Sequence, residues 1–285
     1  SVHAHARITR IDRKRALAVP GVLAVFTGED LGEDLGTMKM TLKRKRPDGS
    51  PMFAPAHQAL ARGRARYVGD PVAMVVAESR YLAEDALEDI QVELEPLPAV
   101  TDLEAALAPG APLVHEQFGS NVAASVRQSK GDYAAAKAKA HSVIARRFSY
   151  DRGVSAAIEN RGIVAQWDRR GEELTIWDTT QAPIPVRGML AGWLGLRESQ
   201  VRVIAPFIGG GFGPKIMMFY QEEVLVPWAA MRLNRPVKWI EDRAENFVAT
   251  THERGQIHDA EVAFAEDGRI LGVHDVFLHD AGAYA

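Results

Sequence analysis

Cysteine is absent from all 285 residues of the chain. This absence excludes disulfide bonds, thiolate zinc sites and iron–sulfur clusters ligated by this chain, and it excludes a cysteine beside a metal within these residues. The nine histidines do not cluster at the spacing of metal ligands. The closest pair, His3 and His5, is interpreted as ordinary surface or packing residues. We therefore expect no residue of this chain to ligate a metal directly.

The chain also lacks an apolar run near 18 residues, and no charged and then apolar leader opens it. The first absence predicts that nothing spans a membrane, and the second favours a cytoplasmic protein. The formal net charge is −3, so no strong attraction to nucleic acid or to an anionic membrane is expected. The one basic run, residues 43–46, is interpreted as a solvated loop.

Three consecutive glycines, Gly209, Gly210 and Gly211, are the most informative feature that is present. An apolar stretch over residues 201–208 runs into them and predicts a buried strand, and a helical pattern begins near Phe219. Glycines hold no Cβ atom that would keep a ligand away from the backbone, and they tolerate positive φ. A strand, a glycine turn and a helix in this order are typical of an anion or cofactor cradle.

Two common cradles do not fit this stretch. A P-loop needs glycine directly before its lysine and a hydroxyl residue after it, but Lys215 lies between Pro214 and Ile216. The third glycine of a dinucleotide fingerprint would also fall on Pro214. Two alternatives stay open at this point: a tight turn needed only for packing, and a nucleotide-dependent enzyme that uses the loop for phosphate.

Residues 201–215, with the sequence VRVIAPFIGGGFGPK, resemble the molybdenum cofactor-binding subunit of the xanthine dehydrogenase, aldehyde oxidase and carbon monoxide dehydrogenase family. The segment DTTQAP at residues 178–183 is similar to the family's segment that carries a glutamine near the metal. The spacing of Gln181 and Phe212 suits the family's pairing of these positions. Residues 67–77, YVGDPVAMVVA, resemble the α/β hammerhead domain that precedes the cofactor domain, and further matches lie at residues 222–230, 235–243 and 275–284.

The resemblance implies an α+β fold, in which a small α/β hammerhead domain is followed by the first part of a mixed α/β molybdopterin-binding domain. The predicted boundaries are residues 1–107 for the hammerhead domain, 108–130 for a linker and 131–285 for the first part of the cofactor domain. The family's large subunit is much longer than this chain. We therefore expect the N-terminal portion of such a subunit, with the catalytic glutamate base and a second metal-side loop beyond Ala285.

The activity that the resemblance implies is molybdenum-dependent hydroxylation of an aldehyde, an N-heterocycle or another small molecule, with water as the oxygen source. The expected cofactor is molybdenum–molybdopterin in its cytosine dinucleotide form. Electrons would pass to an iron–sulfur (FeS) subunit and an FAD subunit, and a dimer of heterotrimers is expected for the full-length enzyme. The isolated chain is expected to be inactive. The alternative is a non-catalytic fragment that acts only as a folding or subunit-interaction module.

The same resemblance implies catalytic roles for Gln181 and Phe212. Gln181 would donate a hydrogen bond to an oxygen ligand of the metal, a task that suits an amide because it donates without carrying charge. Phe212 would exclude water from the metal. Gly210, Gly211 and Gly213 would bind the cofactor together with these two side chains. Plain core packing remains the alternative for Phe212, and a buried amide that ties down a loop remains the alternative for Gln181.

Lys215 and Ile216 are expected along the substrate channel. Purine-hydroxylating members of the family carry a glutamate where Ile216 stands, so xanthine is not the expected substrate. The loop is more similar to the bacterial carbon monoxide dehydrogenase-like branch, whose members mostly oxidise other small molecules.

The charged residues at 159–161 and 241–243 lie in apolar surroundings and predict buried ion pairs that hold strands together. A substrate-channel role for either segment is the alternative. Hydrophobic periodicity predicts a helix from about Ser79 and a kink at Pro227 in the helix after the loop. A long polar loop is expected over residues 38–55. Further strands are predicted at residues 22–26, 72–77, 90–94, 142–150, 162–168, 174–178, 237–240, 261–265 and 270–278, and further helices at residues 102–107, 132–140 and 184–194.

Overall fold

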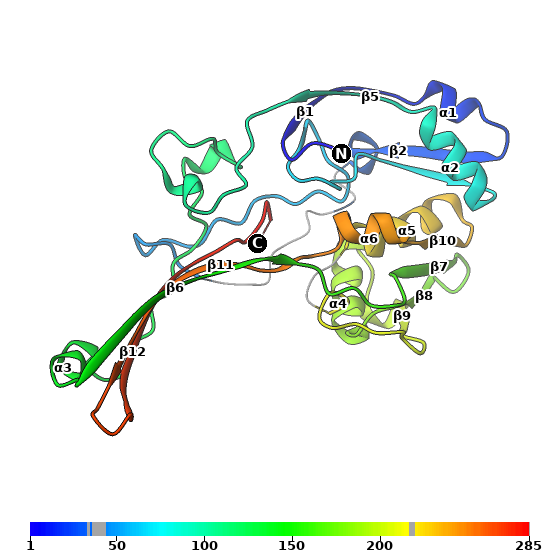
Figure 1. Ribbon diagram of the computed structural model, residues 1–285. Helices are drawn as coiled ribbons and strands as arrows, with labels where there is room; N and C mark the ends of the chain where they lie inside the picture. Colours follow the sequence, from blue (N-terminus) through cyan, green and yellow to red (C-terminus); the bar gives the residue numbers. More distant parts are fainter. Residues whose placement is uncertain (33–34, 36–43, 217–219, 285) are drawn as a thin grey trace. The chain divides into compact units, whose positions relative to one another are not determined.

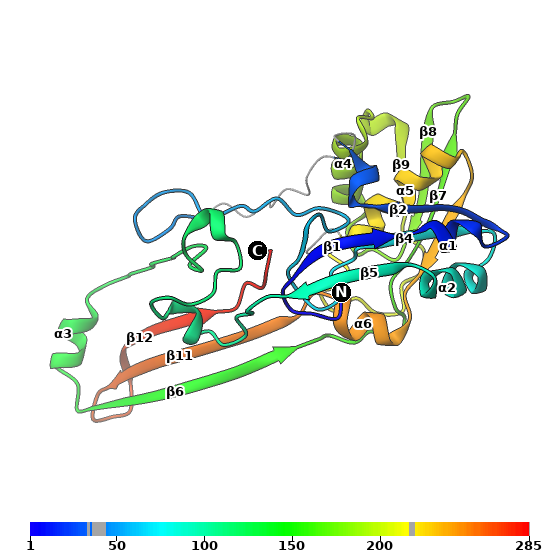
Figure 2. The same ribbon diagram turned by 90° about the horizontal axis from the view of Figure 1, so that it is seen from above.

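The computed structural model describes residues 1–32, 35, 44–216 and 220–284 of the chain (Figure 1 and Figure 2). The chain divides into two compact units, each assembled from segments that are distant in sequence. The first comprises Ser1–Lys39, Ala56–Pro98 and Val154–Thr251, and the second comprises Met40–Pro55, Ala99–Gly153 and His252–Ala285. Helices and strands are mixed along the whole chain, which confirms the expected α+β class.

A four-stranded sheet in the first unit carries the residues of interest. Its strands lie in the order β10-β7-β8-β9, and only β8 and β9 are parallel. Alternate side chains of β8 point inward, so that Leu174, Ile176 and Asp178 are buried while Trp177 is exposed. A carboxylate therefore occupies the last inward position of an otherwise apolar row. The bounds are Gly162–Asp168 for β7, Glu173–Asp178 for β8, Val201–Ile204 for β9 and Val237–Ile240 for β10.

Helix α4, Pro183–Leu194, provides the crossover that joins the parallel strands β8 and β9. Proline at its first turn and a left-handed Gly195 after its last residue define its ends, close to the predicted bounds of residues 184–194. Helix α5, Gln221–Leu233, continues through Pro227 and is buried over most of its length. The predicted start near Phe219 lies outside the described residues.

Helix α5 is apolar on nearly every side because it packs against two sheets. One is the four-stranded sheet, and the other is the antiparallel pair of β2, Val22–Thr27, and β4, Ala73–Ala77 (Figure 1). The ring of Phe26 in β2 meets the ring of Trp228 in α5 edge-on, with centroids 4.7 Å apart. Residues of the first 98 positions and residues of the segment 154–251 thus share one core.

The remaining elements of the first 98 residues surround the β2–β4 pair. Helix α2, Arg80–Glu88, begins where Ser79 Oγ accepts a hydrogen bond from Leu82 N, which confirms the predicted cap. A second sheet has the order β3-β1-β5. Strand β1 and helix α1 were not predicted from the sequence, because the exposed and buried residues of β1 do not alternate cleanly. The bounds are Ala6–Asp12 for β1, Lys14–Ala18 for α1, Arg64–Ala65 for β3 and Gln91–Pro96 for β5.

The second unit contains a long antiparallel sheet with the order β12-β11-β6 (Figure 2). Its strands are β6, Ser142–Gly153, β11, Glu253–Phe264, and β12, Ile270–His279. Helix α3, Tyr133–Ala138, is capped by Asp132, as predicted. Short 3₁₀ turns in the two units cover Gly28–Leu31, Ala105–Leu107, Glu116–Phe118 and Glu198–Gln200.

Some boundaries differ from the sequence prediction. Strand β9 ends at Ile204 rather than at residue 208, since Pro206 has no N–H for a ladder hydrogen bond. The helix expected over residues 102–107 is only a 3₁₀ turn, and helix α6, Arg243–Ala249, was missed. Part of the loop expected over residues 38–55 lies outside the described residues. No helix in the described part of the chain is long and apolar enough to cross a membrane.

Replacing Ile176 by alanine tests the shared core. Ile176 is fully buried, so Ile176→Ala should lower the free energy of unfolding by about 2–5 kcal/mol through lost burial and a cavity. Urea unfolding of the chain measures this. Glu173→Ala, an exposed change on the same strand, should stay within about 0.5 kcal/mol of the parent. Equal losses in both variants would contradict this placement of the core.

Candidate functional site

The glycine-rich turn after β9 has a backbone that requires glycine at particular positions. Gly210 and Gly213 have φ of +102° and +101°, a region that residues with a Cβ rarely adopt. Phe212 also lies in the left-handed region, with φ of +53°, and its side chain is 71% exposed. The loop therefore displays an aromatic ring and bare backbone at the surface. This exposure does not support plain core packing for Phe212.

Gly211 is required for a different reason. Its φ lies outside the left-handed region, but a Cβ atom there would lie 2.2 Å from both Cδ and Oε1 of Gln181. The backbone N–H of Gly213 donates to the same Oε1 at 3.2 Å. The amide of Gln181 thus rests on the bare backbone of Gly211. The structure brings together the glutamine and the loop that the sequence pairs.

The segment that carries Gln181 is fixed from both sides. Thr179 Oγ1 accepts from Gly162 N at 2.9 Å, and Thr180 Oγ1 donates to the carbonyl of Lys215 at 3.2 Å. The backbone N–H of Gln181 donates to that same carbonyl at 2.8 Å. In the described part of the chain, no hydrogen bond engages Nε2 of Gln181, whose side chain is at the surface. A donor N–H₂ is therefore presented beside the loop.

Lys215 and Ile216 have opposite environments. The Lys215 side chain is 3% exposed, and its Nζ lies 3.1 Å from Glu159 Oε2. Ile216 is 45% exposed. Of the two residues expected along a substrate channel, only Ile216 therefore has its side chain at the surface.

Arg161 forms the predicted buried ion pair, but with a partner from the other charged segment. Its Nη2 lies 2.7 Å from Glu241 Oε1, and its Nη1 lies 3.1 Å from Glu222 Oε1. Its guanidinium lies 3.4 Å from the centroid of the Tyr220 ring. The pair joins the start of β7 to the end of β10.

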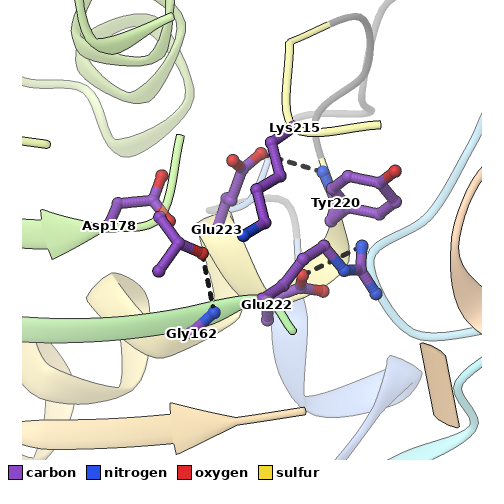
Figure 3. A pocket seen from close by; sticks show the side chains of 8 residues that line it. Gly162, Asp178, Lys215, Tyr220, Glu222 and Glu223 are labelled. Atoms are coloured by element: carbon purple, nitrogen blue, oxygen red, sulfur yellow. Dashed lines mark hydrogen bonds and ion pairs between the residues drawn. The ribbon is translucent and has the colours of Figure 1, made fainter. Parts of the chain in front are cut away.

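Three carboxyls lie in the same buried region, around a cavity of about 10 Å³, which is close to the space of one water molecule (Figure 3). Burial raises the pKa of Glu222 to about 7, against the opposing charge of Arg161. Burial and the neighbouring Asp178 raise the pKa of Glu223 well above its usual range, and burial also raises the pKa of Asp178. Burial and the two neighbouring carboxyls therefore favour the protonated form of Glu223.

Two family profiles match the chain. The molybdopterin cofactor-binding domain matches residues 114–285, and the aldehyde oxidase and xanthine dehydrogenase a/b hammerhead domain matches residues 1–98. The chain belongs to the molybdopterin cofactor-binding domain family. The resemblance seen in the glycine loop and in residues 67–77 is thereby confirmed.

Similar proteins include subunits of molybdenum enzymes. The chain is 38% identical over 281 residues to the nicotine 6-hydroxylase large subunit of Paenarthrobacter nicotinovorans, which covers 99% of this chain and 34% of that subunit. It is 38% identical over 298 residues to the carbon monoxide dehydrogenase large chain of Afipia carboxidovorans, and the match covers 100% of this chain and 35% of that one. The crystal structure of quinoline 2-oxidoreductase from Pseudomonas putida 86 superposes with a TM-score of 0.89 at 38% sequence identity. The superposition covers 100% of this chain and 35% of that chain. The chain spans about a third of the length of these relatives.

The loop presents open space and polar groups at its surface, which are compatible with a bound molybdopterin group. Its backbone is bare at the surface, and space stays open where a Cβ of Gly213 would lie. The N–H₂ of Gln181, which no described residue engages, supplies a neutral donor beside it. In the described part of the chain, no group of three or more histidine, aspartate or glutamate side chains is arranged to hold a metal. Binding through backbone and amide groups is the chemistry that this surface offers.

Sequence reasoning missed the carboxyls behind the loop. Asp178 belongs to the family-like segment 178–183, and Glu222 and Glu223 belong to the match at residues 222–230. None of the three carboxyls was assigned a role from the sequence. A usable signal existed, because Asp178 continues the inward row of Leu174 and Ile176. A charged residue at an inward position needs a partner across the core.

The pH dependence of stability tests the raised pKa of Glu223. Its raised pKa means that the folded chain keeps a proton which the unfolded chain loses near pH 4.5. This stabilising contribution is fully present below that pH and is lost as pH rises through the folded value. The free energy of unfolding should therefore fall as pH rises above about 4.5, and Glu223→Gln should flatten the fall because an amide does not titrate.

Chemical unfolding at several pH values measures this slope. Asp70, which lies outside this carboxyl cluster, has a raised pKa in both proteins, so the difference between parent and variant reports on Glu223 together with its coupled neighbour Asp178. Glu173→Gln, at an exposed position, should keep the parent slope. Identical slopes for the parent and Glu223→Gln would show that Glu223 is ionised in the folded chain.

Proposed function

We propose that this chain forms one wall of a molybdopterin site in a molybdenum hydroxylase subunit. The subunit oxidises an N-heterocycle, an aldehyde or another small molecule, with water as the oxygen source. The contact of Gln181 with Gly211 carries the proposal, because it sets a neutral donor against bare backbone at the surface. Membership of the molybdopterin-binding family supports it.

Each residue has a part in this site. The backbone at Gly210, Gly211 and Gly213 approaches the cofactor, and Gln181 Nε2 donates a hydrogen bond to it. The exposed ring of Phe212 excludes water. Bound there, molybdenum–molybdopterin would supply the two-electron oxidation of the substrate.

The finer features of the enzyme belong to the same proposal. The cofactor is the cytosine dinucleotide form, and electrons pass to iron–sulfur and FAD subunits in a cytoplasmic dimer of heterotrimers. The support is indirect, through relatives named as the large subunit or large chain of an enzyme. A non-catalytic folding or interaction module, the other candidate, would not require bare glycine backbone and a free amide donor at the surface.

An N-heterocycle is the favoured substrate class. Two of the relatives are named for nicotine and quinoline, which are nitrogen heterocycles. Ile216 offers an exposed apolar surface after the loop, and it cannot pair with the polar edge of a purine. Leaving such polar groups unpaired costs about 1–3 kcal/mol.

Substrate preference should follow from Ile216. In the full-length enzyme, kcat/KM for xanthine should be roughly 100-fold below that for quinoline, because the purine's polar groups find no partner at this position. Ile216→Val, which keeps the apolar surface, should preserve the ratio, whereas Ile216→Glu should narrow it. Xanthine turnover equal to that of quinoline in the parent enzyme would refute the assignment.

Gly211→Ala tests the role of the loop. The added methyl group would displace Gln181, so bound molybdenum in the full-length protein should fall several-fold, by more than the folded fraction does. Molybdenum content, melting temperature and specific activity are measured on one preparation. Gly192→Ala is the control, because Gly192 lies in α4 with no atom within 4 Å of the new Cβ.

The control should keep the molybdenum content and gain up to about 1 kcal/mol of stability, since alanine favours a helix over glycine. Full molybdenum content with unchanged activity in Gly211→Ala would remove the loop from the cofactor site. A loss of stability with normal activity per folded molecule would assign it to packing.

A further inference from the structure

Lys215 carries a positive charge into the interior of the first unit, directly after the glycine loop. Its side chain is 3% exposed, and buried lysines are rare unless they are paired. The side chain lines the cavity shared with Asp178 and Glu223 (Figure 3). A substrate could touch the ammonium group only if the side chain left this position.

The ammonium end of Lys215 fixes the first glycine of the loop through Glu159. Nζ donates to the backbone carbonyl of Glu159 at 3.0 Å and to its Oε2 at 3.1 Å. The same Oε2 accepts from Gly209 N at 2.7 Å, and Glu159 N donates to the Gly209 carbonyl at 3.2 Å. A Cβ on Gly209 would lie 2.6 Å from Cβ of Glu159, so the two segments are in close contact.

The carbonyl end of Lys215 fixes the glutamine. That oxygen accepts from Thr180 Oγ1 at 3.2 Å and from Gln181 N at 2.8 Å. The Gln181 side chain in turn accepts from Gly213 N. Lys215 is therefore hydrogen-bonded at both ends. Its ammonium group binds Glu159, which holds Gly209 at the start of the loop. Its carbonyl oxygen binds the Thr180–Gln181 segment, which contacts Gly211 in the middle of the loop.

We propose that Lys215 is a positioning residue, which sets Gln181 against the glycine loop without touching the substrate. The role of Gln181 rests on the proposed function, whereas the positioning rests only on the contacts above. The charge matters because an ammonium group can donate to the backbone carbonyl and to Oε2 of Glu159 and compensate the carboxylate charge. An apolar side chain of similar length can do neither.

Hydrogen exchange in the full-length protein tests the positioning without any cofactor. In Lys215→Met, exchange should speed up at least about 10-fold in peptides that contain Gly209–Gly213 and Thr180–Gln181, but not in peptides from β6. Lys238→Met, which removes an exposed lysine of β10, should leave all of these peptides unchanged. Unchanged exchange at the loop, or a uniform increase over the whole protein, would overturn the proposal.

Kinetics of the loaded enzyme separate positioning from a substrate-channel role. For quinoline and for a quinoline carboxylate, Lys215→Met should lower kcat per bound molybdenum at least about 10-fold, with KM changed by less than about 2-fold. Adding Glu159→Gln should recover part of the loss, because position 159 then holds no negative charge that lacks its ammonium partner. A rise in KM confined to the carboxylate, with kcat retained, would assign Lys215 to the channel instead. If the parent protein holds no molybdenum, the proposed function fails, and the exchange result still decides the role of Lys215.

Discussion

The guanidinium of Arg161 is a charge that the interior cannot neutralise by deprotonation, because an arginine side chain stays protonated and its carboxylate neighbours raise its pKa further. Acidic partners must therefore accompany it. Glu222 comes from α5 and Glu241 follows β10, so satisfying one cation fixes the relative positions of three elements. Burial, together with the other acids gathered around Arg161, raises the pKa of Glu223 well above its usual range and so favours its protonated form.

Local elements were largely predictable from the sequence, because period-2 alternation, capping residues and turn residues act over a few positions. Strand β7 and helix α2 are examples. The two charged segments indicated buried ion pairs correctly. Their partners were not predictable: Arg161 pairs with Glu241, 80 residues away, while nearby Glu159 pairs with Lys215. Such choices depend on tertiary register, which no local pattern encodes.

The candidate site was likewise predictable only in part. The family-like motif anticipated that Gln181 and the loop belong together. It did not reveal why, since the steric demand at Gly211 and the positive φ of Phe212 exist only in the folded backbone. The resemblance also treated Lys215 and Ile216 alike, although one side chain is buried and the other is at the surface. Whether a side chain is buried depends on residues that are distant in sequence. Two adjacent residues of one motif can therefore have opposite environments, as Lys215 and Ile216 do.

The core shared by Phe26 and Trp228 has a consequence for how the protein is made. Residues 1–98 leave the ribosome long before α5 has been synthesised, so the β2–β4 pair must wait with Phe26 lacking its main partner. Contacts of this sequence separation slow folding and prolong exposure of apolar surface. The nascent chain therefore exposes this apolar surface at least until α5 has emerged. For the same reason, the first 98 residues are poorly suited to transfer between proteins as a detachable module.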